Sequence, residues 1–271
     1  MTDYSHPMPR FDANLSMMFN EVGFLERFAA AAAAGFRGVE FLFPYPYGKD
    51  QLRDVAGASG VEVVAFNMPP GDWDRGERGI ACDPRRRGEF QDGVGKAVEY
   101  AQALSCRRVH AMAGLRPRDM DDERVREAYV SNLAFAARAL QERGITLLVE
   151  AINPRDIPGF YLTTSRQAFA LMDEVAAPNL RFQADLYHLQ IVEGDLSHTL
   201  ESRRDRIGHV QIADTPGRHE PGTGEINYPF LFGHLDRIGY QGWIGCEYRP
   251  LATTAAGLGW LRPYLEQRSA P

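Results

Sequence analysis

One short pattern recurs along this chain: a helix-like segment ends at a glycine, and an apolar, strand-like segment follows within a few residues. It occurs in AAGFRGVEF, GASGVEVVAF, ERGITLLVE and DRIGYQGWIGCE, which contain Gly35, Gly60, Gly144 and Gly239. Glycine just past a helix end is a common stop signal, because it adopts the left-handed backbone conformation without strain. The pattern therefore predicts that helices and strands alternate along the chain.

The expected elements alternate from one end of the chain to the other. The expected strands cover 11–18, 38–43, 61–67, 108–114, 146–153, 180–186, 207–213 and 242–248. The expected helices cover 21–34, 51–58, 83–104, 121–143, 165–175, 196–204, 228–238 and 252–267. Alternating β and α units predict a parallel sheet, and eight of them predict a closed (β/α)₈ TIM barrel, class α/β. Such a barrel takes about 250 residues, so we expect a single domain over 1–271. A doubly wound open sheet is the alternative, but no GxGxxG follows the first strand.

Composition and charge exclude several classes of protein. The formal net charge is −6, whereas non-specific nucleic-acid binders are usually basic. Cys82, Cys106 and Cys246 form no CxxC pair, which indicates reduced thiols in a cytosolic protein. The first residues, MTDYSHPMPRF, contain no apolar signal-peptide core, and no apolar run is long enough to span a bilayer. We therefore expect a cytoplasmic protein with neither a membrane nor a nucleic acid as its partner.

Oxygen-bearing side chains end four consecutive expected strands: Glu150, Asp185, Gln211 and Glu247. An ionised glutamate at the end of an apolar strand carries a large desolvation cost unless something pairs with it. In a barrel the carboxyl ends of the strands surround one mouth, so we expect the four side chains to meet there. Three carboxylates in an apolar mouth would repel each other, and a bound divalent cation removes that conflict. Carboxylate and amide oxygens suit Mg²⁺ or Mn²⁺, although a salt bridge or helix cap explains any one of the four alone.

Further polar residues are expected at the same mouth, on strand ends or on the loops beside it: Glu40, His110, His188, Asp214, Arg218, Arg75 and Arg78. The last two lie in the long loop NMPPGDWDRGERGIACDP, which is too long for a simple turn and is typical of a functional loop or lid. Burial in the core is the alternative for Glu40 and the histidines, and solvation is the alternative for the arginines. In a protein of net charge −6, arginines on mouth loops are where an anionic substrate would be held.

The ordered set Glu150, Asp185, Gln211 and Glu247 resembles the metal site of the xylose isomerase-like TIM barrels. The loop FNMPPGDWDRGERGIACDP, with VHAMAG after it, closely resembles the hydroxypyruvate isomerase family, including its 2-oxo-tetronate isomerase branch. The similarity covers essentially the whole chain. The GDW-x-x-GERG-x-A loop is the more diagnostic feature, because the metal set is shared with sugar epimerases. Ketose 3-epimerases generally carry His where Gln211 stands, which counts against that branch.

The resemblance implies a metal-dependent isomerase that interconverts hydroxypyruvate and tartronate semialdehyde, or a related 2-oxo-3-hydroxy acid such as 2-oxo-tetronate, through an enediolate. It implies that Glu150 and Glu247 are the catalytic pair and also bind the metal, with Asp185 and Gln211 as the remaining ligands. His188 and Arg218 resemble substrate-contacting positions of the epimerases. A homo-oligomer, dimeric or tetrameric, is implied in the same way.

Three alternatives to this function remain open. A ketose 3-epimerase of the same superfamily would use the same kind of chemistry. A DNA-repair endonuclease of the same barrel would use several metals and many histidines, whereas this chain has 7 His and an acidic charge. A non-catalytic sugar-binding barrel would leave the paired glutamates unexplained.

Overall fold

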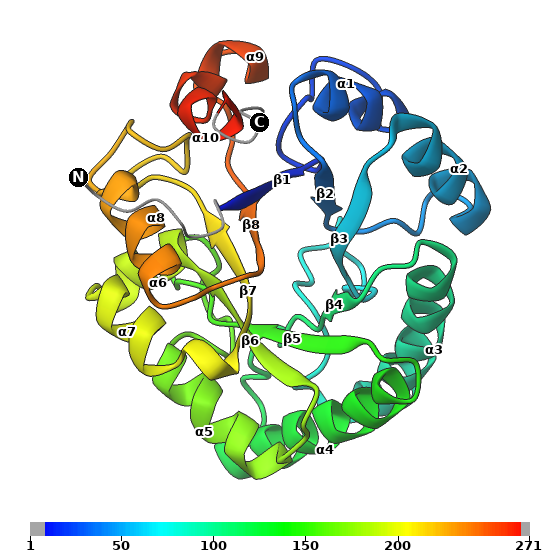
Figure 1. The fold of residues 1–271 in the computed structure, drawn as a ribbon. Coiled ribbons are helices and arrows are strands. Elements are labelled where there is room, and N and C mark those ends of the chain that lie inside the picture. Colours follow the sequence, from blue (N-terminus) through cyan, green and yellow to red (C-terminus); the bar gives the residue numbers. More distant parts are fainter. Residues whose placement is uncertain (1–8, 267–271) are drawn as a thin grey trace.

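The computed structural model describes residues 9–266 and contains a closed barrel of eight parallel strands with helices around it (Figure 1). The strands are β1 (Arg10–Asn14), β2 (Gly38–Phe41), β3 (Glu62–Asn67), β4 (Arg108–His110), β5 (Thr146–Glu150), β6 (Leu180–Asp185), β7 (Ile207–Ile212) and β8 (Trp243–Cys246). Each pairs with its neighbour in sequence, and β8 pairs with β1 to close the barrel. The predicted (β/α)₈ fold is thus confirmed, and the open sheet is excluded.

The helices that follow these strands form the outer layer. They are α1 (Arg27–Ala33), α2 (Lys49–Ser59), α3 (Arg87–Ala103), α4 (Asp122–Gln141), α5 (Ser165–Val175), α6 (Leu186–Val192), α7 (Leu196–Ser202), α8 (Tyr228–Arg237), α9 (Thr254–Gly257) and α10 (Arg262–Glu266). Short 3₁₀ turns are η1 (Phe24–Glu26), η2 (Pro84–Arg86), η3 (Arg204–Arg206) and η4 (Leu258–Trp260). A continuous apolar core lies between the helices and the strands, and Val64, Ala65 and Trp243 form a second, smaller cluster.

The glycines of the recurring pattern act as the sequence predicts. Gly35, Gly60, Gly144 and Gly239 all have positive φ, between 67° and 97°. Each follows the end of a helix and precedes the next strand, so a residue with a Cβ would strain the turn at that point.

Several element boundaries differ from prediction. The first helix starts at Arg27, after a 3₁₀ turn, instead of at residue 21. Strand β4 ends at His110, because the next residues leave the barrel and bridge to Gly79 of the long loop. The segment expected as one helix over 252–267 is broken into α9, η4 and α10 around the glycine-containing stretch 257–259, and residue 267 lies outside the described residues. Helix α6 was not predicted; it begins directly after Asp185, whose side chain accepts a hydrogen bond from Tyr187 N.

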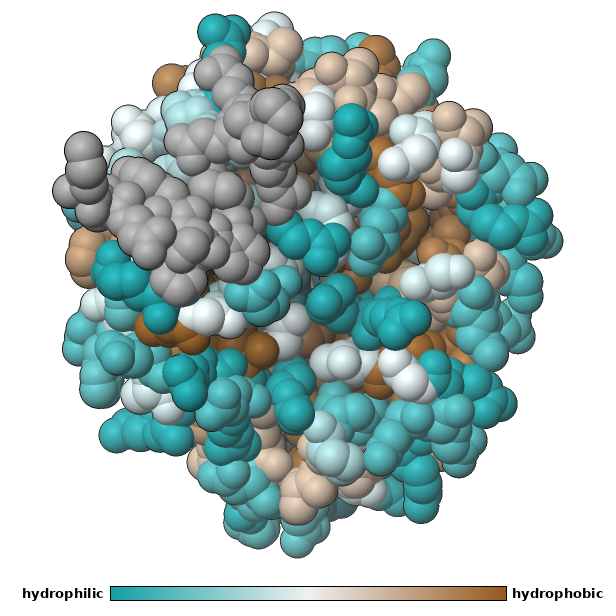
Figure 2. All heavy atoms as spheres, in the orientation of Figure 1, coloured by the Kyte–Doolittle hydropathy of each residue, from teal (hydrophilic) through white to brown (hydrophobic). Residues whose placement is uncertain are grey.

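The visible face of the molecule is dominated by hydrophilic residues, with apolar atoms showing mainly between them (Figure 2). Within residues 9–266, none of the helices has the length and apolar character needed to cross a bilayer.

Candidate active site

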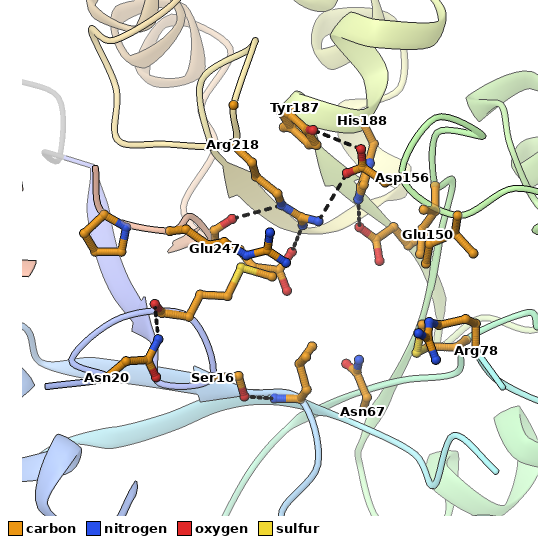
Figure 3. Close-up of a pocket in the computed structure, with 18 of the residues that line it drawn as sticks. Ser16, Asn20, Asn67, Arg78, Glu150, Asp156, Tyr187, His188, Arg218 and Glu247 are labelled. Carbon is orange, nitrogen blue, oxygen red and sulfur yellow. Dashed lines mark hydrogen bonds and ion pairs between the residues drawn. The ribbon is translucent and has the colours of Figure 1, made fainter. Parts of the chain in front are cut away.

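A pocket of about 940 Å³ opens at the carboxyl ends of the strands. Five of the predicted site residues line it (Figure 3). Glu150, His188, Arg218 and Glu247 each come from a different strand end or following segment, and Arg78 comes from the long loop. Asp185 is buried next to them, within hydrogen-bonding distance of Arg218. The barrel thus brings together the residues that the sequence places on consecutive strands.

Glu150 is the last residue of β5 and is 6% exposed. Its Oε1 is buried and accepts no hydrogen bond from the described residues. Burial, with the charges of Glu247 and Asp185 next in importance, raises the pKa of Glu150 well above its usual range. An unpaired carboxylate in this position needs either a proton or a cation.

His188 presents its Nε2 to the acidic residues, 3.5 Å from Asp185 Oδ2 and 3.9 Å from Glu150 Oε1. The other ring nitrogen, Nδ1, lies 2.6 Å from Asn153 Nδ2. Asn153 Oδ1 accepts a hydrogen bond from Asp156 N, so its NH₂ group faces the ring. The imidazole is therefore neutral, with its proton on Nε2, and burial lowers the pKa of His188 well below its usual range. In this tautomer His188 is a hydrogen-bond donor to the pocket.

Arg218 supplies a positive charge directly beside the carboxylates of the site. Its Nη2 donates to Glu247 Oε2 at 2.5 Å and to Asp185 Oδ2 at 3.1 Å, and its guanidinium lies 5.0 Å from the ring centre of Tyr187. Glu247, just past β8, also accepts a hydrogen bond from Asn14 Nδ2 at 3.2 Å. Burial raises the pKa of Glu247 to about 8 despite the opposing effect of Arg218.

Gln211 lies beneath the pocket on β7, 4% exposed, with both ends of its amide engaged. Its Nε2 donates to Glu40 Oε1 and its Oε1 accepts from Gln183 Nε2, each at 2.7 Å. Asp185, Glu150 and Glu247 all have raised pKa values, chiefly through burial. This excess of buried carboxylates, with an unpaired Glu150 oxygen and a hard amide oxygen nearby, fits a divalent cation such as Mg²⁺ or Mn²⁺.

A sequence model of the family described as xylose isomerase-like TIM barrel matches residues 28–264 of this chain. The chain belongs to this family. Among curated relatives, a 2-oxo-tetronate isomerase from Cupriavidus necator is 55% identical over 95% of this chain and 99% of its own length. A hydroxypyruvate isomerase from Escherichia coli is 51% identical over 95% of this chain and 100% of its own. The predicted membership in the hydroxypyruvate isomerase branch is confirmed, and so is the prediction that the chain is an isomerase.

Solved structures of other proteins show the same architecture. The crystal structure of an AP endonuclease, family 2, from Brucella melitensis superimposes with a TM-score of 0.93 at 49% identity, over 95% of this chain and 99% of that one. An L-ribulose 3-epimerase superimposes with a TM-score of 0.77 at 20% identity, over 96% of this chain and 95% of that one. The second likeness shows the shared fold alone.

Four residues predicted at the mouth lie elsewhere. Asp214 is fully buried and accepts hydrogen bonds from backbone N–H groups of its own loop. The Arg75 side chain is 86% exposed, pairs with Asp72 and is not part of the pocket wall, because the turn of its loop directs it to solvent. Glu40 is 2% exposed and lies below the pocket among buried polar groups. His110 is also buried outside the pocket wall, with Nε2 3.8 Å from Glu150 Oε2. Arg78, by contrast, lines the pocket as predicted.

Sequence reasoning missed several residues of this site, chiefly Asn14, Gln183, Asp156 and Tyr187. A signal for the first two was present, since polar residues alternate on three expected strands. The pairs are Asp12 with Asn14, Gln183 with Asp185, and His209 with Gln211. Side chains two residues apart on a strand point to the same side, and all six are buried in the barrel. Asp156 and Tyr187 lie on segments after the strands, where no periodicity gives their direction.

Proposed function

We propose that this chain is a metal-dependent isomerase of small 2-oxo-3-hydroxy acids, with hydroxypyruvate or 2-oxo-tetronate as its substrate. The observation that carries the proposal is the meeting of two buried glutamates, Glu150 and Glu247, in one pocket from β5 and β8. Relatives at 51% and 55% identity bear the names of these two activities, which supports the choice of substrate class.

The reaction moves a carbonyl group between adjacent carbons, so one carbon loses a proton and its neighbour gains one. Two carboxyl groups facing the same substrate can exchange the roles of base and acid during this transfer. Glu150 and Glu247 are placed to do so, and neither is assigned the first proton. A divalent cation held by Glu150, Asp185, Gln211 and Glu247 would polarise the carbonyl and stabilise the enediolate. His188, with its proton on Nε2, donates to a substrate oxygen.

The carboxylate of such a substrate meets Arg78. The Arg78 guanidinium lies 4.0 Å from the ring centre of Trp73, and its Nη1 donates to the carbonyl oxygens of Trp73 and Glu77. Arg78 forms no ion pair within residues 9–266, whereas Arg218 already faces several carboxylates. A fixed arginine without an acidic partner on a pocket wall is suited to an anionic ligand.

A substrate panel tests the proposal directly. Purified protein is assayed with hydroxypyruvate, 2-oxo-tetronate and a free ketohexose, after chelation and again with Mn²⁺ added. We expect turnover of a 2-oxo acid that chelation abolishes and Mn²⁺ restores. Epimerisation of the ketohexose alone would identify a 3-epimerase instead, and binding without turnover would identify a sugar-binding barrel. Cleavage of DNA containing an abasic site would favour the endonuclease, which the net charge of −6 disfavours.

Location and assembly form part of the same proposal. The scattered cysteines favour a cytoplasmic enzyme, and the family resemblance implies that it acts as a homodimer or homotetramer. Size-exclusion chromatography with light scattering measures the oligomeric state.

A further inference from the structure

Glu40 is a buried carboxylate that does not line the pocket, yet it is hydrogen-bonded to residues that build the site. Its Oε1 accepts from Gln211 Nε2 at 2.7 Å and from Asn14 Nδ2 at 3.0 Å. Its Oε2 lies 2.7 Å from His209 Nε2. Glu40 belongs to β2 and reaches across the barrel to β7, below the mouth. We call Glu40 and its hydrogen-bond partners Asn14, His209 and Gln211 the junction.

The hydrogen bond to Glu40 determines which end of the Gln211 amide faces the pocket. An ionised carboxylate only accepts hydrogen bonds, so the NH₂ group of Gln211 must face Glu40. The carbonyl oxygen then points the other way, toward Gln183 Nε2, a residue of the pocket wall. Without Glu40, either end of the amide could face the site, and only the oxygen end can bind a cation.

A second chain of hydrogen bonds connects Glu40 through Asn14 to Glu247. Asn14 Nδ2 donates to both Glu40 Oε1 and Glu247 Oε1, at 3.0 and 3.2 Å. Asn14 Oδ1 accepts from Ser16 N, so the orientation of this amide is also determined. Glu40 therefore constrains two of the four oxygen-bearing residues of the site.

We propose that Glu40 is a positioning residue that presents the Gln211 carbonyl oxygen, and through Asn14 the Glu247 carboxylate, to a divalent cation. The proposal rests on the metal dependence of the proposed function. It assigns a role to Glu40 although Glu40 does not line the pocket. Groups that orient metal ligands typically change metal affinity or activity by about 10–100-fold when removed.

The test measures Mn²⁺ binding to chelator-stripped protein by titration calorimetry, separately from turnover. Glu40→Gln is expected to raise the Mn²⁺ dissociation constant about 10–100-fold and to lower kcat at saturating metal, with KM much less affected. Glu220→Gln is the matched control, because Glu220 is also buried but accepts its hydrogen bond from Leu251 N, away from Glu40 and outside the pocket. We expect this control to leave the dissociation constant unchanged.

A double-mutant comparison distinguishes positioning from a general loss of structure. If Glu40 acts through Gln211, Glu40→Gln adds little further weakening of Mn²⁺ binding in a Gln211→Leu background. Should Glu40→Gln fail to fold, Asn14→Ala removes the hydrogen bonds that connect Glu40 to Glu247, but not the one to Gln211, and is expected to weaken Mn²⁺ binding several-fold.

Two results would overturn the proposal. The first is wild-type affinity for Mn²⁺ in Glu40→Gln, or in Asn14→Ala if Glu40→Gln does not fold. The second is that the wild-type protein binds two Mn²⁺ ions and Glu40→Gln loses one of them. The last would mean that an ion binds in the cluster of Asp12, Glu40 and His209, whose potential ligand atoms lie within 4.8 Å of one another. Wild-type protein that binds no Mn²⁺ and turns over after chelation would instead overturn the metal dependence itself.

Discussion

Glu150 and Glu247 face one pocket but differ in their partners: Glu247 is paired with Arg218, while Glu150 Oε1 accepts no hydrogen bond from residues 9–266. Both are buried, and burial raises the pKa of both. The same sequence signal, a carboxylate at the end of an apolar strand, therefore produces two electrostatically different groups. In the proposed isomerisation, this difference would allow the two glutamates to take different roles in the proton transfer.

Replacing either glutamate by glutamine should abolish most turnover and preserve the fold. Glu150→Gln and Glu247→Gln keep size and shape but cannot exchange a proton, and acid–base catalysis contributes roughly 10²–10⁴-fold. We expect kcat to fall by about that factor, with near-wild-type circular dichroism. Glu220→Gln is the control, since Glu220 is buried and bonds Leu251 N outside the pocket. Near-normal kcat in either site variant would contradict the paired assignment.

Removing Arg218 should destabilise the metal-free protein far more than the metal-loaded one. Arg218→Met leaves Asp185 and Glu247 without their cationic partner, and breaking a buried ion pair typically lowers the free energy of unfolding by about 3–5 kcal/mol. Thermal unfolding with a chelator, and then with Mn²⁺, should show a larger increase in Tm on metal addition than in wild type. Arg249→Met, at the exposed rim of the same pocket, should behave as wild type. Equal destabilisation of Arg218→Met in both conditions would count against this account.

Two arginines of one loop should differ sharply in their effect on substrate binding. Arg78→Met removes a charged group from the pocket wall, and hydrogen bonds to charged groups contribute about 1.5–3 kcal/mol. We expect kcat/KM for a 2-oxo acid to fall roughly 10–100-fold, mainly through KM. Arg75→Met is the matched control, because this side chain points into solvent. A similar loss in both variants would show that the loop attracts anions without a specific contact.

Gly245→Ala should destabilise the barrel from its interior. A Cβ at this position would lie 2.7 Å from both carboxylate oxygens of Glu40, which are held by hydrogen bonds to three other side chains. Overpacking of this kind lowers the free energy of unfolding by about 1–3 kcal/mol. Gly57→Ala, in α2 with no atom within 4 Å of the new Cβ, should instead stabilise by about 0.5–1 kcal/mol. Denaturant unfolding measures both, and an unchanged midpoint for Gly245→Ala would disprove the crowding.

Buried thiols should make the protein less stable at high pH. Burial raises the pKa of Cys82 and Cys106 from 9.0 to about 12. Between these values the unfolded chain loses each thiol proton while the folded protein keeps it. The free energy of unfolding therefore falls as pH rises, by about 1.4 kcal/mol per pH unit for each thiol. Cys82→Ala should reduce this slope by one thiol's share, measured by denaturant unfolding over that range. A slope identical to wild type would show that Cys82 titrates normally.

The fold was predictable because its signals are local. A glycine that ends a helix can be recognised within four or five residues, as at Gly35, Gly60, Gly144 and Gly239. Eight alternations of strand and helix are compatible with few architectures. The candidate ligands were predictable for the same reason, since Glu150 and Asp185 end their strands in sequence as in structure.

The position of each side chain along the barrel axis could not be predicted from the sequence. Glu40 sits on an inward face, as expected, but lies below the mouth because β2 pairs with Asn14 of β1 and shifts its register against β3 between Val39 and Glu40. Strand register depends on pairing around the whole barrel, and one sequence does not display it. The directions of Arg75 and Arg78 depend likewise on a loop conformation that has no periodicity.

The long loop that carries Arg78 has a consequence for the timing of catalysis. Gly79 bridges to Ala113, and Cys82 N donates to Ala113 O, so the loop is fastened to the segment after β4. At Gly79 and at Gly114 a Cβ would lie within 2.5 Å of the facing backbone. Enzymes with a swinging cover often wait on its opening to release product. In the proposed enzyme Arg78 would already be held in place when the substrate arrives, so we expect product release not to wait on a movement of this loop.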